Sequence, residues 1–185
     1  MKVFGGELRF FGIGGAKLDA QTEQFLYEAE FPYAIGYGLT ETAPLLAGKV
    51  PFKHPVGSTG PKMDGVELRI ADPNENGEGE LQAKTPSVLQ GYYKNPEATA
   101  AAFTEDGWFR TNDSAIIDEN GVVFIKGRMN SMLIGPSGEN IYPEDIENVL
   151  NSHPYVSESI VTEEDGKLIA LVRFDYDKLQ AKYDS

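Results

Sequence analysis

The sequence has no cysteine, no long apolar run and only two histidines, and each of these absences excludes a class of protein. Without cysteine there is neither a disulfide framework nor a thiolate metal site, which fits a cytoplasmic protein. No run of about 18 apolar residues occurs, so no transmembrane segment is predicted, and residues 1–6 lack the apolar core of a signal peptide. His54 and His153 stand far apart without matched partners, so neither a catalytic triad nor a metal centre is expected from them.

Positive charge is also scarce, because 16 basic residues face 29 acidic ones and the net charge is −13. This balance argues against a basic nucleic-acid-binding surface. It would also repel ATP and CoA at long range, so such anions would have to be held by backbone N–H groups and a few placed cations. The 185 residues, 41% of them hydrophobic, suffice for one domain or two small ones, and the 20 glycines and 11 prolines favour strands and turns over a helical bundle.

The hydrophobic pattern predicts a mixed α+β fold in three parts. Residues 1–45 are typical of an α/β segment, with a strand in 8–13, a helix capped by Asp19 and a second strand in 33–38. Residues 46–129 are β-rich and predict a small barrel-like or curled sheet. Its predicted elements are strands 66–71 and 80–83, a helix begun by Asn95 and Pro96, and a hairpin of 114–117 with 122–126.

Residues 130–185 form the third part, which is predicted to be α+β. A helix is expected to begin at Pro143, with acidic residues in its first turn. A hairpin of 156–162 with 168–174 follows, and another helix begins near Tyr176.

Gly36-Tyr37-Gly38-Leu39-Thr40-Glu41 is the stretch whose residue types best suit a nucleotide. The glycines let the backbone approach a ligand closely, and Tyr37 offers a flat face to a base. Thr40 offers a hydroxyl to a phosphate and Glu41 a hard oxygen to Mg²⁺. A strand that ends in a glycine turn and a capped helix would explain the same residues, so both interpretations stay open on this stretch alone.

Four other stretches are weaker when each is taken alone. The run 12–17 lacks the third glycine of a dinucleotide fingerprint and is explained by a tight turn. Asp113, in Gly-Trp-Phe-Arg-Thr-Asn-Asp, could accept hydrogen bonds from ribose hydroxyls or merely cap a strand. Arg128 could meet a sugar or phosphate, or form a surface ion pair. Tyr92 and Tyr93 are expected to pack in the core.

The order of these motifs carries a resemblance that none of them carries alone. Along the chain come a Gly-Gly-Ala turn, Tyr-Gly-Leu-Thr-Glu, Gly-Glu-Leu, Gly-Tyr-Tyr-x-x-Pro-Glu-Ala-Thr, Gly-Trp-Phe-x-Thr-x-Asp, Gly-Arg and Gly-Glu-x-Ile-x-Pro-x-x-Ile-Glu. This series resembles the adenylate-forming superfamily of acyl-CoA synthetases, luciferases and peptide-synthetase adenylation domains. The run 137–144 is most similar to bacterial long-chain fatty-acid:CoA ligases.

The resemblance implies two half-reactions and a set of site residues. A carboxylate, such as a fatty acid, attacks the α-phosphate of MgATP to give acyl-AMP and pyrophosphate, and the thiol of coenzyme A then displaces AMP. The resemblance implies that Gly14, Gly15 and Ala16 border the adenine and the acyl pocket, and that Tyr37 stacks on adenine where Gly36 and Gly38 allow a close approach. It also implies that Thr40 contacts a phosphate and that Glu41 binds Mg²⁺. Asp113 would bind the ribose, supported by Arg128.

A mobile C-terminal domain is also implied. Its hinge would be Asn130, where members of the family usually have Asp or Lys, and Gly138 would line the CoA channel. No Ser/Thr/Gly-rich phosphate loop precedes Gly14, and neither Lys178 nor Lys182 has the Gly-Lys context of the family's late lysine. The sequence therefore predicts a piece of a larger ligase that is inactive alone. Its exposed apolar surface is expected to favour dimerisation, and peripheral membrane contact is compatible with the sequence.

Two alternatives stay open. The parent could be another adenylating enzyme, with a carrier-protein or aryl acceptor or with no acceptor. The chain could also be a non-catalytic nucleotide-binding or interaction module.

Overall fold

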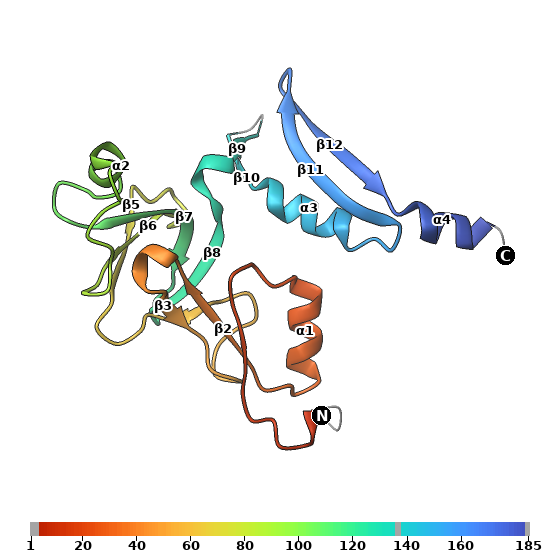
Figure 1. Cartoon of the computed structure of the whole chain (residues 1–185), viewed down its shortest axis with the longest axis horizontal. Helices are drawn as coiled ribbons and strands as arrows, with labels where there is room; N and C mark the ends of the chain where they lie inside the picture. The colour runs from red at the N-terminus through yellow and green to blue at the C-terminus, as the bar shows by residue number, and fades with distance from the viewer. Residues whose placement is uncertain (1–3, 136–137, 184–185) are drawn as a thin grey trace. The chain divides into compact units, whose positions relative to one another are not determined.

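The computed structural model describes residues 4–135 and 138–183, and these divide into two compact units (Figure 1). The first unit spans Met1–Lys126 and the second Gly127–Ser185. The predictions that rest on Ser137 and on the first three residues lie outside the described part. Within the described part, no helix is long and apolar enough to span a membrane. The three-part division of the sequence stays a prediction.

The first unit begins with a three-stranded sheet in the order β1-β2-β3. Its elements are β1 (Phe11–Ile13), α1 (Ala20–Glu28), β2 (Tyr33–Gly38), the 3-10 turn η2 (Thr40–Thr42) and β3 (Leu45–Gly48). Strands β1 and β2 are parallel, and β3 runs antiparallel to β2. Asp19 caps α1 as predicted, because its Oδ1 accepts the amide of Thr22 at 2.8 Å.

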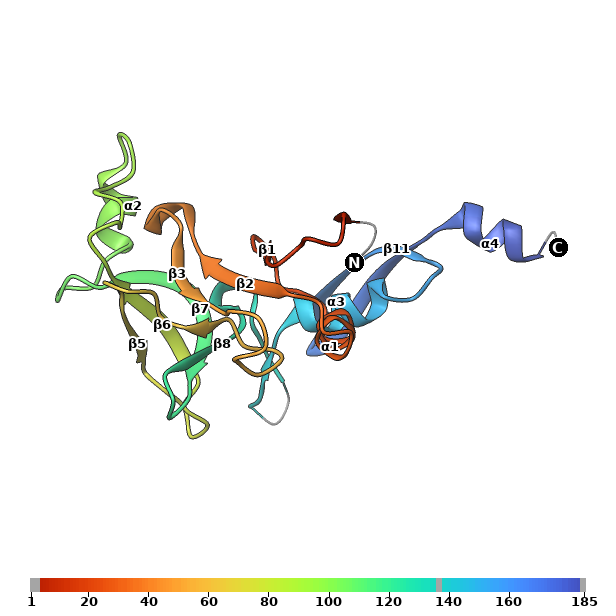
Figure 2. The same ribbon diagram turned by 90° about the horizontal axis from the view of Figure 1, so that it is seen from below.

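The same unit continues into a five-stranded sheet in the order β4-β8-β7-β6-β5. The elements are β4 (Gly60–Pro61), β5 (Glu67–Ala71), β6 (Gly79–Lys84), α2 (Pro96–Ala101), β7 (Phe109–Ile117) and β8 (Val122–Arg128). In Figure 2 the strands β5 to β8 follow one another across this sheet. The mixed α+β class is confirmed, but the barrel is not: β4 and β5 are the two edges of an open sheet.

Two small apolar clusters hold the sheets of the first unit together. One contains Ala47, Leu81, Ala115 and Val123, and the other Leu46, Val66 and Ala83. Tyr37 packs against both clusters, so the ring that was predicted to meet a base is also part of the core.

A buried ion pair fixes α1 against the rest of the first unit. The Lys49 ammonium lies 2.5 Å from Oε1 of Glu23, and each residue is 2% exposed. The Tyr33 phenol donates to the same oxygen at 3.0 Å, the Gly57 amide donates to Oε2 at 2.9 Å, and the ammonium also donates to the Pro55 carbonyl at 2.8 Å. Burial, and then the bond to Glu23, raise the pKa of the Tyr33 phenol far above its usual range. Each charge therefore has the partners that make its burial tolerable.

The second unit contains η3 (Met129–Ser131), β9 (Leu133–Ile134), β10 (Asn140–Ile141), α3 (Pro143–Asn151), β11 (Val156–Glu164), β12 (Lys167–Phe174) and α4 (Tyr176–Tyr183). Strands β11 and β12 form an antiparallel hairpin, and α3 packs against β11. Oε1 of Glu147 on α3 accepts the Val161 amide at 2.7 Å, and the Ser159 hydroxyl donates to Oδ1 of Asn151 at 2.9 Å. The helix that begins at Pro143 and the hairpin are thus confirmed.

Candidate functional site

Tyr37 and Asp113 stand 76 positions apart in the sequence and are joined by a hydrogen bond. The Tyr37 phenol donates to Oδ2 of Asp113 over 2.5 Å. Because Tyr37 lies on β2 and Asp113 on β7, the bond connects the two sheets of the first unit. Asp113 is only 4% exposed, so its carboxylate is held in one place. The structure thus brings together the residue predicted for adenine and the residue predicted for ribose.

The Gly-Gly-Ala turn follows the carboxyl end of β1, beside the carboxyl end of β2. A Cβ atom on Gly14 would lie 3.3 Å from the carbonyl oxygen of Gly36, so the two backbones are in close contact. Gly15 has a φ of +89°, a conformation that favours glycine, and Ala16 is exposed. Ligands of α/β sheets bind outside the carboxyl ends of parallel strands, so this edge is the expected place for one.

Gly36 and Gly38 are required by the chain itself as well as suited to a ligand. A Cβ atom on Gly38 would overlap the carbonyl oxygen of Pro44, and one on Gly36 would lie 2.8 Å from Cδ1 of Leu45. Both positions therefore let β3 fold back tightly along β2. The sequence left open whether these glycines serve a turn or a ligand. The structure shows the turn, and a turn is compatible with a nearby ligand.

Thr40 and Glu41 lie in the turn η2, directly after β2. Thr40 is exposed, and the Glu41 side chain is half-buried. The phenol of Tyr92 donates to Oε1 of Glu41 at 3.0 Å, and the Leu89 amide donates to the Glu41 carbonyl at 2.7 Å. Burial, and then the bond to Glu41, raise the pKa of Tyr92. The loop after β6 thus orients the carboxylate that was predicted to hold Mg²⁺.

A single carboxylate such as Glu41 fits a magnesium ion carried in by a nucleotide. The described residues contain no group of three or more His, Asp or Glu side chains that could hold a metal ion by themselves. Mg²⁺ commonly binds one or two carboxylates and takes its other ligands from substrate phosphates and water. Glu41 directly follows Thr40, whose side chain is exposed, so a carboxylate and a hydroxyl stand next to each other in η2.

Three predicted site residues belong to the second unit. Arg128 is exposed at the end of β8, Asn130 is exposed in η3, and Gly138 is exposed with a φ of +84°. Their roles at the ribose, the hinge and the CoA channel stay predictions. The boundary between the two units falls at Lys126 and Gly127, a few residues before the predicted hinge.

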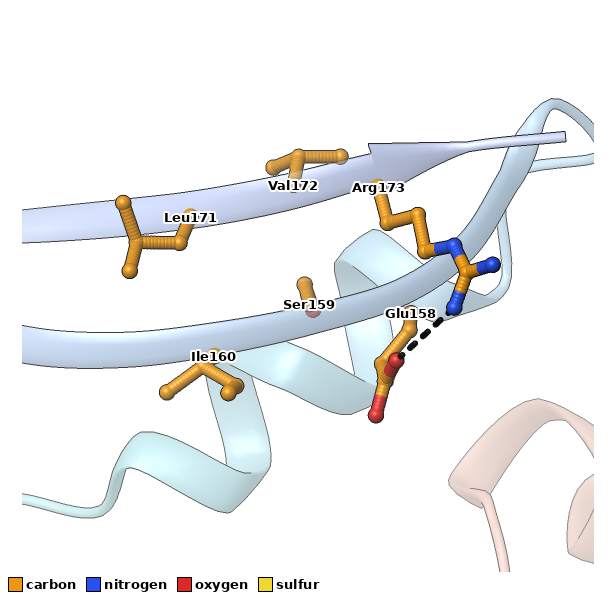
Figure 3. A pocket seen from close by; sticks show the side chains of 6 residues that line it. All are labelled: Glu158, Ser159, Ile160, Leu171, Val172 and Arg173. Carbon is orange, nitrogen blue, oxygen red and sulfur yellow. Dashed lines mark ion pairs between the residues drawn. The ribbon is translucent and has the colours of Figure 1, made fainter. Parts of the chain in front are cut away.

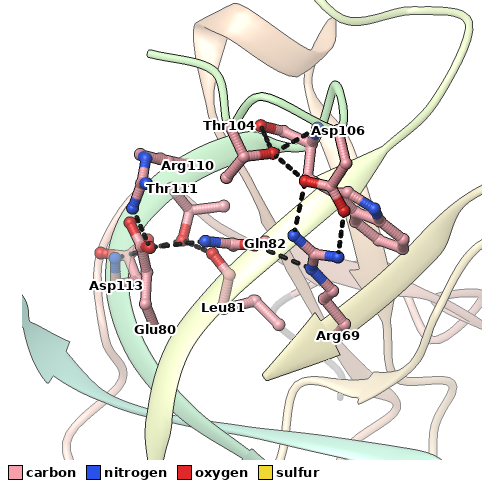
Figure 4. A network of polar contacts seen from close by, with 10 residues as sticks. Arg69, Glu80, Leu81, Gln82, Thr104, Asp106, Arg110, Thr111 and Asp113 are labelled. Carbon is pink, nitrogen blue, oxygen red and sulfur yellow. Dashed lines mark hydrogen bonds and ion pairs between the residues drawn. The ribbon is translucent and has the colours of Figure 1, made fainter. Parts of the chain in front are cut away.

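A polar network lies along β5, β6 and β7, next to Asp113 (Figure 4). Arg69 binds both carboxylate oxygens of Asp106 at 2.6 and 3.0 Å, and its Nε donates to Gln82 at 2.8 Å. The Gln82 amide and the Arg110 guanidinium both donate to Oε2 of Glu80, at 2.8 and 3.0 Å. Arg69 holds the pKa of Asp106 well below its usual range. Strand β7, which carries Asp113, is therefore linked to β6 through side chains as well as through the backbone.

A shallow pocket lies on the β11–β12 hairpin (Figure 3). Glu158 and Arg173 lie at one end of it, 4.0 Å apart, and Ile160 and Leu171 are exposed beside them. None of the predicted site residues lines this pocket.

Two residues near the site were not predicted to act there. Tyr92 was expected in the core, together with Tyr93, and this was wrong: the two are 38% and 87% exposed. Thr111 received no role, yet its hydroxyl accepts the Asp113 amide at 3.1 Å. An asparagine between Thr111 and Asp113 was the available signal, since Asn is unfavourable within a regular strand.

Known proteins share sequence similarity with most of this chain. The family model described as "AMP-binding enzyme" matches residues 1–93. Over 94% of its length the chain is 36% identical to the long-chain-fatty-acid–CoA ligase FadD15 of Mycobacterium bovis, and it covers 28% of that protein. It is 32% identical, over 97% of its length, to the 2-succinylbenzoate–CoA ligase of Listeria monocytogenes, and it covers 40% of that protein.

A solved structure shows the same similarity. The o-succinylbenzoate CoA synthetase of Bacillus subtilis, in complex with ATP and magnesium ion, aligns with a TM-score of 0.77 and 31% identity over 90% of this chain and 37% of that one. The chain belongs to the AMP-binding enzyme family. It spans between about a quarter and two fifths of the length of these relatives.

Proposed function

We propose that the protein is an AMP-forming acyl-CoA ligase, which activates a carboxylic acid with ATP and transfers the acyl group to CoA. The observation that supports this most directly is the Tyr37–Asp113 hydrogen bond, because it joins Asp113 to the glycine-rich strand β2, which leads directly into Glu41. In the first step a carboxylate oxygen bonds to the α-phosphorus while the bond to pyrophosphate breaks. In the second step the CoA thiol adds to the acyl carbon, AMP leaves, and the thiol proton passes to solvent.

The residues of the first unit would act mainly by positioning. The Tyr37 ring would stack on adenine while its phenol stays bonded to Asp113. The Asp113 carboxylate would accept hydrogen bonds from the ribose hydroxyls. Thr40 would donate to a phosphate oxygen, and Glu41 would bind the magnesium ion that neutralises charge on the phosphates. Gly14, Gly15 and Ala16 would border adenine and the acyl chain. Arg128, which belongs to the second unit, is proposed to support the ribose contact. Holding the reactants in place and neutralising charge account for most of the acceleration in such a transfer.

Pyrophosphate exchange tests the first half-reaction. The full-length protein should incorporate labelled pyrophosphate into ATP only when its carboxylic acid and Mg²⁺ are present. Glu41→Gln should raise the Mg²⁺ concentration needed for half-maximal exchange, while Lys53→Gln, at an exposed position in the first unit, should leave it unchanged. Equal Mg²⁺ dependence in the wild type and the Glu41 variant would contradict the metal role.

Long-chain fatty acids are the substrates we propose first. The relatives of this chain include long-chain-fatty-acid–CoA ligases of Mycobacterium and of Saccharomyces cerevisiae, each 36% identical to it. The 2-succinylbenzoate–CoA ligases at 32% to 37% identity support an aromatic dicarboxylate as the second candidate. Exchange measured with palmitate and with 2-succinylbenzoate separates the two, and thioester formation with CoA or with acyl carrier protein separates the acceptors.

The chain of 185 residues is proposed to be inactive alone, because the phosphate loop and the late lysine predicted for the whole enzyme do not occur in it. Pyrophosphate exchange by this chain in isolation would contradict that proposal. A cytoplasmic location, peripheral membrane contact and dimerisation stay predictions.

A further inference from the structure

Strand β7 has a bulge that ends at Asp113. Between the pairs Gln82–Arg110 and Glu80–Ser114, β6 has one residue, Leu81, while β7 has the three residues 111–113. A regular antiparallel ladder would place one residue opposite one, so two residues of β7 are extra. Such a bulge redirects the side chains of the bulged strand, and Asp113 is the last residue of this bulge.

The hydroxyl of Thr111 holds this bulge together. It donates to the carbonyl of Leu81 at 2.7 Å, and it accepts the Asp113 amide at 3.1 Å. Thr111 is 1% exposed, so both bonds are shielded from water. Figure 4 shows Thr111 between Leu81 and Asp113. The Thr111 hydroxyl thereby links Leu81 on β6 to Asp113, whose carboxylate is buried.

Asn112 supplies the backbone conformation that the bulge requires. Its φ is +57°, in the left-handed region that glycine and asparagine adopt with least strain and that β-branched residues avoid. Its side chain is exposed, so the residue contributes through its backbone. After this turn Asp113 points to Tyr37 on the neighbouring sheet rather than along the regular alternation of β7.

We propose that Thr111 is a positioning residue for the nucleotide: its hydroxyl sets the path of the bulge and thereby aims the Asp113 carboxylate at the ribose hydroxyls. This inference rests on the proposed function, in which Asp113 binds the ribose. Thr111 would act through Leu81 and Asp113, to which its hydroxyl is bonded.

The test compares the binding of AMP and of 2′,3′-dideoxy-AMP to the full-length protein by calorimetry. A site built to bond the ribose hydroxyls should favour AMP by about tenfold or more. Thr111→Val keeps the shape and removes the hydroxyl, and it should lower this preference to about a third or less. Thr111→Ser keeps the hydroxyl and should preserve the preference. A general loss of stability would weaken both nucleotides equally and leave the ratio unchanged, which would overturn the inference.

Asn112 gives a second, independent pair of variants in case Thr111→Val fails to fold. Asn112→Gly should keep the preference for AMP, and Asn112→Val, which opposes a positive φ, should reduce it. Asp113→Ala tests the underlying assignment and should abolish the preference. If Asp113→Ala keeps it, the proposed ribose contact is wrong; if Asp113→Ala loses it while Thr111→Val and Asn112→Val keep it, only the positioning role is wrong.

Discussion

Replacing Lys49 with methionine removes the cation from the buried ion pair and retains a side chain of similar length. Glu23 would stay in place with an uncompensated charge at a position that is 2% exposed. It would keep two neutral donors, the Tyr33 phenol at 3.0 Å and the Gly57 amide at 2.9 Å. The substitution therefore isolates the contribution of the ammonium group.

The expected loss follows from these partners. Removing one member of a buried ion pair typically costs about 3–5 kcal/mol, because the other charge is left buried. The two remaining bonds to Glu23 are charge-assisted and soften the loss, so we expect a decrease of about 3 kcal/mol in the free energy of unfolding. Removing both charges, in Glu23→Gln with Lys49→Met, should cost less than the sum of the two single substitutions, because neither charge is then stranded.

Urea unfolding, followed by the fluorescence of Trp108, measures the effect. Lys49→Met should lower the midpoint without changing the dependence of stability on urea concentration. The matched control is Lys53→Met, the same substitution at an exposed lysine, which should change stability by no more than about 0.5 kcal/mol. A loss below about 1 kcal/mol for Lys49→Met would refute the argument, since it would mean that the pair is solvated in the folded protein.

Three further predictions concern the helix cap, the glycine turn and the tryptophan. Asp19→Ala should lower the free energy of unfolding by about 1 kcal/mol, while Asp19→Asn should retain most of the cap. Because the folded-state pKa of Asp19 is lowered, its advantage over Asn is present at neutral pH and should vanish as acidification below about pH 4 protonates it, which stability measured against pH will show. Gly38→Ala should disrupt the turn into β3 and abolish AMP binding, whereas Gly12→Ala, whose added Cβ atom would meet a flexible ring at 3.4 Å, should bind AMP normally. Arg69→Ala should shift the emission of Trp108 to longer wavelength, because the guanidinium that lies 4.5 Å from its ring centroid is lost. The emission of Arg69→Lys should lie between those of the wild type and Arg69→Ala. An unchanged spectrum in Arg69→Ala would argue against the stacking.

Local signals in the sequence predicted most of the regular elements. The caps Asp19 and Asn95 and the initial Pro143 mark the starts of three helices, and each begins where its cap indicates. Strand β2 has the predicted bounds because an apolar run ends there at a glycine turn. These features depend on residues within a few positions of one another, which is the range over which caps and turns act.

Of the two forms predicted for the β-rich part, barrel-like or curled, the barrel was wrong, and the reason is that closure depends on long-range pairing. Short strands with frequent turns are compatible with a closed or an open sheet, and the local pattern does not say which strands form the edges. Strand β3 was missed for a similar reason. It has only four residues, and it pairs with β2 because the glycines at 36 and 38 allow a close return of the chain.

The candidate site shows the same division between what is local and what is not. Tyr37, Glu41 and Asp113 were each predicted from their chemistry and from the order of the motifs, but their partners were not. The Tyr37–Asp113 bond spans 76 positions, and the bond from Tyr92 to Glu41 spans 51. These bonds orient the Tyr37 ring and the carboxylates of Glu41 and Asp113. The sequence predicted the types of these functional groups, and the three-dimensional structure shows how they are oriented. Specific recognition depends on those directions, which the residue types in a motif do not state.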